Sequence, residues 1–271
     1  MKRRDFLKFS AAAALTGAAA ACGASPAAGA SSAPTASSAP APASSAAPGE
    51  AASGGALSLT TNEGDVFPLA DLEHLTGDAG ASAVYFTREI SAAALVRAYE
   101  ALGWAPAGRV AVKLSTGEPP ASNYLRPDLV GDLIRSLNGT IVECNTAYGG
   151  ARSSTESHYQ VAREHGFAGI AAVHIQDENG SMTLPVEGGA RLRENYVGAA
   201  FADYDDYVVL SHFKGHAMAG YGGAIKNISI GLGSREGKQW IHSGGTGGSM
   251  WSGEQDAFLE AMGDAGKSVS D

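Results

Sequence analysis

Short apolar runs and longer amphipathic stretches alternate along the chain from residue 82 onward. The apolar runs predict five strands, at residues 82–87, 109–115, 140–145, 169–176 and 206–213. The amphipathic stretches predict four helices, at residues 89–104, 127–138, 153–166 and 254–263. Because strands that alternate with helices assemble into parallel sheets, we predict a single α/β domain with a mainly parallel sheet and flanking helices.

Three polar loops follow predicted strands, and parallel α/β proteins bind ligands at that edge of the sheet. Their sequences are TGEPPASN, NTAYGGAR and HFKGHAMAGYGG. The third lies within residues 211–233, SHFKGHAMAGYGGAIKNISIGLG, which hold two histidines, two lysines and six glycines. So many ionisable groups around small residues indicate a site for an anionic or metal-bearing ligand. A purely structural glycine-rich turn is the alternative.

The glycines and basic residues of these loops favour an anion. Gly222 and Gly223 permit close approach of the backbone to a ligand. A helix that begins near Ala224 would direct its free N–H groups toward a phosphate or carboxylate. Lys214 adds charge, as does Arg152 unless it is only solvated. The Walker A pattern GxxxxGK[ST] does not occur, and GLGSREGK has the wrong spacing for a Rossmann fingerprint.

Two histidines and one lysine are candidates for chemistry. Imidazole titrates near neutral pH and acts as a base or as a metal ligand, which applies to His216 and to His242 in the segment WIHSGG. A lysine near other cations has a lowered pKa and is more nucleophilic, which applies to Lys226. We therefore predict His216 and Lys226 as catalytic residues. The predicted cofactor-binding set is Arg152, Lys214, Gly222, Gly223 and Lys226.

Other ionisable residues are weaker candidates. Cys144 ends a predicted strand, where it is either a buried thiol or a ligand or nucleophile. Glu118 and Glu143 lie near strand ends and could transfer protons, with a surface position the alternative for Glu118. His212 lies in a predicted strand, where a packed and a functional histidine are both open. The remaining histidines are interpreted as structural: His74, His158, His165 and His174.

The N-terminus has the sequence MKRRDFLKFSAAAALTGAAAAC, which predicts a signal peptide over residues 1–22. Arg3 and Arg4 form a twin-arginine pattern, and the apolar run after them is too short for a good membrane-spanning helix. Cys22 ends a lipoprotein-like cleavage box and is the predicted site of lipidation. We therefore expect export by the twin-arginine pathway and a lipid anchor on the outer face of the cytoplasmic membrane. An ordinary N-terminal helix is the alternative.

Composition separates a tether from a domain. Residues 23–56 are almost entirely Ala, Ser, Pro and Gly, which predicts a disordered tether, and residues 57–271 are long enough for one core. The formal net charge of −9 argues against nucleic acid and against electrostatic binding to anionic lipid. Cys22 and Cys144 are the only cysteines. If Cys22 is lipidated, the chain has no internal disulfide, and it lacks the cysteines for a Cys-only zinc or iron–sulfur site.

Long motifs in the chain resemble the domain-of-unknown-function 362 (DUF362) family. They are VKLSTGEPPASNYLRPDLV, TIVECNTAYGGAR, ENYVGAAF, VLSHFKGHAMAGYGGAIKNISIGLGSREGK and WIHSGG. The resemblance covers residues 82–250 and implies an association with iron–sulfur clusters, although the family's activity is largely undefined. Similar members continue into a cysteine-bearing C-terminal segment. This chain ends soon after its last predicted helix, so we expect a C-terminally truncated sequence in which a cluster is in doubt.

The pattern His–Ala-Gly-aromatic-small-Gly–Lys, followed by a later His, is more distantly similar to the lactate racemase family, which uses a nickel-pincer nucleotide. That resemblance implies that His216 is a proton-transfer base, that Lys226 is joined to the cofactor and that His242 ligates nickel. Ala151 stands in the place of a second base, and residues 116–119 replace a phosphate-binding Asp/Arg loop. Two-base racemisation is therefore not expected.

These features predict an exported lipoprotein whose α/β domain binds a small anionic ligand or a cofactor and carries out redox or proton-transfer chemistry. An iron–sulfur cluster or a nickel-type cofactor follows only from the two resemblances. The alternatives are a non-enzymatic ligand-binding lipoprotein of the envelope and an inactive truncated copy. The sequence leaves open whether the protein is an enzyme and whether His216 and His242 converge.

Overall fold

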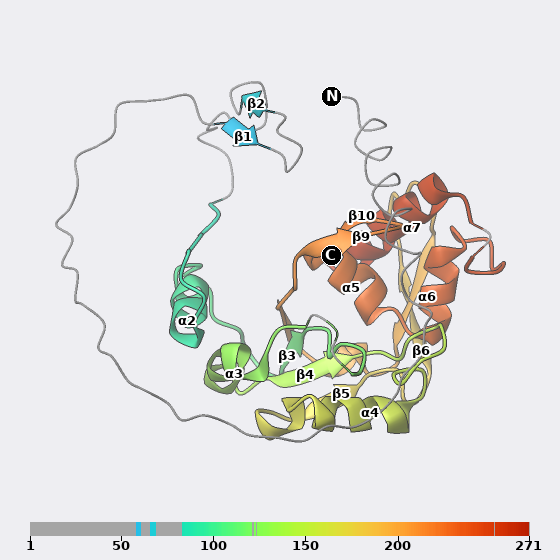
Figure 1. The fold of residues 1–271 in the computed structure, drawn as a ribbon. Coiled ribbons are helices and arrows are strands. Elements are labelled where there is room, and N and C mark those ends of the chain that lie inside the picture. The colour runs from blue at the N-terminus through green and yellow to red at the C-terminus, as the bar shows by residue number, and fades with distance from the viewer. Residues whose placement is uncertain are drawn as a thin grey trace, which may run out of the picture. The chain divides into compact units, whose positions relative to one another are not determined.

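A four-stranded parallel sheet is the centre of the fold (Figure 1). The computed structural model describes residues 58–60, 66–68, 83–120, 122, 124–251 and 253–270. The sheet has the spatial order β5-β4-β3-β8. Its strands are β3 (Val110–Lys113), β4 (Thr140–Glu143), β5 (Val173–Ile175) and β8 (Asp206–Val209). Neighbouring strands pair in parallel throughout, which confirms the predicted α/β class.

The helices of the described part of the chain are α2 (Ala92–Glu100), α3 (Pro127–Ser136), α4 (Thr155–Glu164), α5 (Ala224–Leu232), α6 (Arg235–His242) and α7 (Gln255–Ser268). Of these, α3 and α4 connect neighbouring strands of the sheet, because parallel neighbours need a crossover. Two short 3-10 turns, η3 (Phe167–Gly169) and η4 (Phe201–Asp203), precede β5 and β8. Serine side chains cap α2, α4 and α6 at their N-termini, and Pro127 begins α3, where its missing N–H costs nothing.

The two faces of β3 pack against different helices. Val110 and Val112 join the cluster that contains Leu133 and Ile134 of α3. Ala111 faces the other way and packs with the end of α5. Because side chains alternate along a strand, Lys113 lies on the same side as Ala111, where it bonds to α5. A charged residue at the end of an apolar strand is thereby directed toward α5.

A second core cluster holds α5, α6 and α7 together beside the sheet (Figure 1). Phe258 and Ala261 of α7 are fully buried against Ile241 of α6 and Ile230 of α5. This cluster fixes the position of α6 and therefore of His242, which is the last residue of that helix.

One predicted strand is absent, and most other elements differ at their ends. Residues 83–87 form no strand, because their side chains are exposed without a partner strand, Val84 at 89% and Phe86 at 84%. The helix predicted over 89–104 begins only at Ala92, after its cap Ser91. The helix predicted over 254–263 is α7, which continues to Ser268. A helix does begin at Ala224, as expected.

Between β5 and α7, two antiparallel hairpins and one helix were not predicted. β6 (Ser181–Pro185) pairs with β7 (Glu194–Gly198), and β9 (Lys214–His216) pairs with β10 (Gly220–Gly222). The helix α6 (Arg235–His242) lies in a segment where the sequence analysis predicted no helix. The β9–β10 hairpin and α6 contribute residues to the candidate site described below.

The antiparallel pair of β1 (Ser58–Thr60) and β2 (Val66–Pro68) belongs to a unit separate from the one that contains the sheet. The predicted signal peptide (1–22) with Cys22, the predicted tether (23–56) and His74 lie outside the described residues. Within the described residues, no helix combines the length and hydrophobicity needed to cross a membrane.

Candidate functional site

A cavity of about 290 Å³ lies at the carboxyl ends of β3, β4 and β8. Its walls come from the segments that follow these strands, from the β9–β10 hairpin, and from α5 and α6. Met250 and Trp251 add an apolar side. The cavity therefore lies at the edge of the sheet where parallel α/β proteins bind their ligands.

Most of the candidate residues that the structure describes converge on this cavity, whereas Glu118 is not among its lining residues. Its lining includes Arg152, Lys214, His216, Gly222, Gly223, Lys226 and His242, together with the weaker candidates Glu143, Cys144 and His212. The sequence could not show whether His216 and His242 approach each other, and the structure brings both to the same cavity.

The β9–β10 hairpin presents two of the basic residues. His216 pairs with Gly220 and Lys214 pairs with Gly222 across the hairpin. Gly220 has a φ of +72°, a left-handed conformation that glycine adopts without strain. The tight turn thus places Lys214 and His216 two residues apart on one face of the strand.

His216 has its tautomer set by the hairpin turn. Its Nδ1 accepts a hydrogen bond of 3.1 Å from the backbone N–H of Ala219. Burial and, after it, the nearby charges of Lys226 and Lys214 together lower the pKa of His216 to about 4. At neutral pH the ring is therefore uncharged, and its proton is on Nε2. His216 can donate a hydrogen bond from Nε2 to a ligand.

His242 has the opposite tautomer. Its Nδ1 lies 2.6 Å from the carbonyl oxygen of Lys238, which can only accept, so Nδ1 carries the proton. Burial lowers the pKa of His242, and this bond opposes part of the effect. The ring also stacks on Phe258, with 4.8 Å between ring centroids. The neutral ring keeps a lone pair on Nε2, which can accept a proton or bind a metal.

Lys226 lies in the first turn of α5 and has no hydrogen bond or ion pair among the described residues. Burial lowers its pKa to about 8, and the charges of Lys214 and Lys238 act in the same direction. The side chain is partly buried along the cavity wall. Its amine is therefore the least satisfied cation inside the cavity, and a substantial fraction of it is neutral near pH 8.

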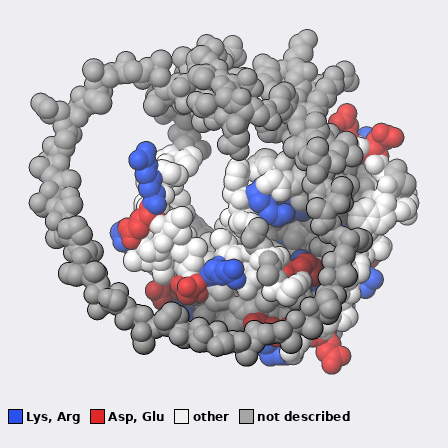
Figure 2. All heavy atoms as spheres, viewed as in Figure 1, with Lys and Arg blue, Asp and Glu red and all other residues white. Residues whose placement is uncertain are grey.

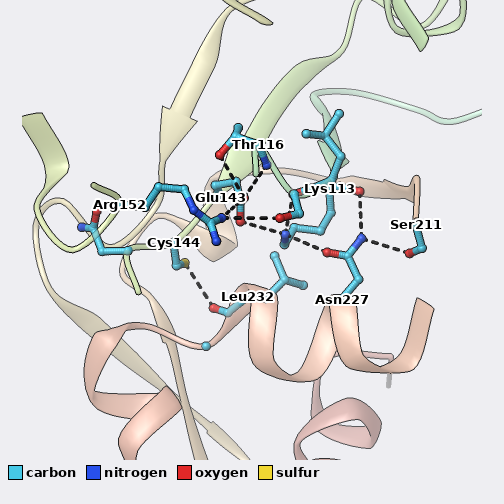
Figure 3. A network of polar contacts seen from close by, with 12 residues as sticks. Lys113, Thr116, Glu143, Cys144, Arg152, Ser211, Asn227 and Leu232 are labelled. Atoms are coloured by element: carbon cyan, nitrogen blue, oxygen red, sulfur yellow. Dashed lines mark hydrogen bonds and ion pairs between the residues drawn. The ribbon is translucent and has the colours of Figure 1, made fainter. Parts of the chain in front are cut away.

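A buried ion network forms the opposite wall (Figure 3). Lys113 Nζ lies 3.0 Å from Glu143 Oε2, and Arg152 Nη1 lies 3.0 Å from Glu143 Oε1. Arg152 Nε bonds Glu118 at 2.9 Å. Burial alone would raise the pKa of Glu143, but Lys113 and Arg152 outweigh it and hold the pKa at about 2. Arg152 is therefore already paired with two carboxylates, so it is less available to a ligand than predicted.

Two neighbours complete this network. Asn227 accepts a hydrogen bond from Lys113 Nζ at 2.9 Å and donates to the Leu210 carbonyl at 3.1 Å (Figure 3). His158, interpreted from the sequence as structural, is fully buried with Nε2 4.0 Å from Glu143. Burial lowers the pKa of His158 to about 4, against the attraction of Glu143. The network is satisfied on all sides and so resists rearrangement.

Lys238 is a second buried cation, and it has no carboxylate partner within the described residues. Its Nζ donates to the carbonyl oxygens of Gly233 and Cys144. Burial lowers its pKa. Gly233 directly follows α5, so Lys238 satisfies the carboxyl end of that helix, where a cation is favourable.

The lining of the cavity is strongly cationic. It contains five basic side chains, Lys113, Arg152, Lys214, Lys226 and Lys238, while Glu143 is the one carboxylate among the described lining residues. Elsewhere, on the face shown in Figure 2, basic and acidic side chains occur in small mixed groups among uncharged residues. The chain as a whole carries a net charge of −9, so this concentration of positive charge is local. Such a cavity attracts anions.

Metal ligands are scarce here. No three His, Cys, Asp or Glu side chains come together as a metal site in the described part of the chain. Cys144 is buried, its Sγ lies 3.3 Å from the Leu232 carbonyl, and burial raises its pKa to about 12. It is a protonated thiol at neutral pH, and as the one cysteine of the described residues it cannot supply the several thiolates that hold an iron–sulfur cluster. His242 Nε2 fits a single ligand to a metal that an anionic cofactor would carry.

Sequence reasoning missed three residues of this site. Lys113 ends the apolar run VAVK, and a charged residue at the carboxyl end of a buried strand was an available signal. Asn227 and Lys238 gave no comparable signal, because their roles depend on how α5 and α6 pack against the strands.

The fold and the cavity define an α/β protein with a cationic site at the carboxyl edge of a parallel sheet. Residues 110–270 match the family described as Domain of unknown function (DUF362). The match spans more than half of the chain, so the protein belongs to that family. No curated protein matches the chain.

Proposed function

We propose that the protein binds a small organic anion, or a cofactor with an anionic group, in the cavity above β3, β4 and β8. The observation that carries the proposal is the excess of five basic side chains over one lining carboxylate. Lys214 and Lys226 have no hydrogen bond or ion pair within the described residues and are free to pair with the ligand. An uncomplexed metal cation would be repelled by the same charges.

The ligand's site also has the parts of a proton-transfer site, and we include this in the proposal. His242 Nε2 offers a lone pair and His216 Nε2 offers a proton, both from neutral rings that line one cavity. A base and a hydrogen-bond donor on the same ligand can remove a proton and stabilise the charge that develops. His242 thus takes the part of the base, and His216 the part of the donor. These assignments differ from the roles that the racemase resemblance implies.

A metal-bearing organic cofactor is compatible with this proposal in a limited way. His242 Nε2 would be its protein ligand, and the lysines would hold its anionic groups. A bound metal would supply an electron sink or a Lewis acid. Export by the twin-arginine pathway and the lipid anchor belong to the proposal as well, and they rest on the N-terminal sequence alone.

Calorimetric titration of the full chain with inorganic phosphate and with propionate tests the anion site. We expect Lys226→Met to weaken binding roughly tenfold, because it removes one charge-assisted contact of about 1.5 kcal/mol or more. Lys267→Met is the matched control, since Lys267 is a lysine of α7 outside the cavity lining. Absence of binding, or equal loss in both variants, would overturn the proposal.

Proton exchange separates an enzyme from a binding protein. In D₂O, we expect the protein to accelerate the exchange of the methyl protons of pyruvate for deuterium. The loss of the methyl signal in the proton NMR spectrum measures this exchange. His242→Asn should abolish the acceleration while pyruvate still binds, because only the base is lost. Binding without any exchange in the native chain would leave a ligand-binding protein and refute the proton-transfer part.

A further inference from the structure

The five basic residues of the cavity differ in how far the protein has already satisfied them. Lys113 Nζ bonds the Leu114 carbonyl, Glu143 and Asn227. Arg152 and Lys238 are bonded to carboxylates and carbonyls respectively. Lys226 has no such partner within the described residues, and Lys214, which also lacks one, is exposed at the surface.

The surroundings of Lys226 keep its amine free and directed along the cavity wall. It is the third residue of α5, where the positive end of the helix dipole disfavours a charged amine. Gly222 lies over its methylene stem, since a Cβ added at Gly222 would be 3.6 Å from Lys226 Cδ. No described carboxylate lies within ion-pair distance to hold the proton on the nitrogen. An amine in this setting is a nucleophile.

We propose that Lys226 forms an imine with the carbonyl group of an anionic ligand, so that the ligand class is an oxo acid or an aldehyde that carries a carboxylate or phosphate. This inference rests on the proposed anion site, because the neighbouring cations must first hold the anionic group. It adds a covalent step that anion binding alone does not require.

The step balances without an added oxidant or reductant. The Lys226 nitrogen lone pair attacks the carbonyl carbon, a C–N bond forms, and the carbonyl π electrons move to the oxygen. The two protons of the nitrogen pass one after the other through His242 Nε2 to the oxygen, while His216 Nε2–H donates a hydrogen bond to the negative charge that forms there. Loss of the oxygen as water then leaves the C=N bond.

Reductive trapping tests the imine directly. The full chain is incubated at pH 7 with pyruvate and sodium cyanoborohydride, which reduces an imine to a stable N-carboxyethyl-lysine that peptide mass spectrometry locates. We expect modification of Lys226 at least roughly tenfold above that of Lys267 on α7, because an amine with a pKa near 8 has a far larger neutral fraction than an ordinary lysine. Propionate has the carboxylate of pyruvate but not its ketone group, so it should occupy the anion site and protect Lys226 from the reaction.

Controls separate this inference from the anion site on which it depends. Lys226→Arg keeps the charge and removes the nucleophile, so it should still bind propionate while the adduct disappears. If propionate binds but pyruvate labels Lys226 no more than Lys267, the imine is refuted and the anion site stands. If propionate does not bind to the native chain, the anion site itself fails. Labelling of Lys214 in place of Lys226 would also refute the assignment.

Discussion

Both sides of the cavity carry basic side chains, but within the described residues the protein pairs these side chains with partners on one side only. On the sheet side, Lys113 and Arg152 are buried around Glu143, and every charge has its partner. On the side of the hairpin and α5, Lys214 and Lys226 have no partner among the described residues. The comparison indicates that the paired residues on the sheet side fix the shape of the cavity. The unpaired lysines on the side of the hairpin and α5 are available to a ligand. If this is correct, charges on the two sides should respond oppositely to substitution.

The largest effect is expected on the sheet side. Glu143→Gln should lower the free energy of unfolding by about 3–5 kcal/mol, because it leaves Lys113 and Arg152 buried without their shared counter-charge. Denaturant unfolding measures this change. Glu260→Gln, which breaks the surface pair with Arg191, is the control and should cost less than about 1 kcal/mol. Equal losses in the two variants would contradict the difference between the walls.

On the ligand side, Lys226→Met should raise stability at pH 7 by about 1–3 kcal/mol, because the native fold lowers the pKa of this lysine. The folded state disfavours the charged amine, so the destabilisation is full below pH 8 and is relieved as pH rises from about 8 toward the unfolded value near 10.4. Unfolding curves across this range should therefore converge at high pH. A variant less stable than the native chain at pH 7 would mean that Lys226 is structurally paired.

A smaller loss of stability is expected when the N-terminal cap of α6 is removed. Ser234 caps α6, with its Oγ accepting the N–H of Gly237 at 3.1 Å, and α6 carries both Lys238 and His242. Ser234→Ala should cost about 1 kcal/mol of stability and also weaken propionate binding. Ser91→Ala removes the corresponding cap of α2, which contributes no residue to the cavity, and should cost a similar amount without changing binding.

The smallest change in stability is expected for substitution of the exposed residue Lys214. Lys214→Met should alter the free energy of unfolding by less than about 0.5 kcal/mol, because Lys214 is exposed and unpaired among the described residues. Propionate binding should nevertheless weaken several-fold, as titration calorimetry would record. A loss of stability without a loss of affinity would assign Lys214 to the scaffold.

The sequence allowed the sheet to be predicted better than the site. Each strand of the sheet has a short apolar run, and each crossover helix has a periodic pattern, so β3, β4, β5 and β8 could all be located. The strand predicted over 82–87 was wrong because an apolar run such as Val84–Phe86 also occurs in exposed chain. The hairpin β9–β10 was missed because glycine-rich segments have no periodicity to detect.

For the site, residue type was informative where the backbone was unusual. His216, Lys226 and their glycines stood out by their density within one loop, and the structure does place them on one cavity. The convergence of His242 and the burial of Lys238 depend on α6 packing against α5 and α7, which no local pattern encodes. The pairing of Arg152 with Glu118 and Glu143 also joins three separate loops or strands.

Asn227 restricts how α5 can move against the central sheet. Its one amide group has four polar contacts: Oδ1 accepts from Lys113 Nζ, and the two N–H groups of Nδ2 are shared among the carbonyls of Lys113 and Leu210 and Ser211 Oγ. It therefore pins α5 to the ends of both β3 and β8, and a slide of the helix by one turn, about 5.4 Å, would break all four. The β9–β10 hairpin is not held in this way, because its two strands pair with each other and not with the central sheet. Of the two lysines unpaired among the described residues, Lys226 thus stands on a helix tied to the sheet, and Lys214 stands on a hairpin that is not part of it.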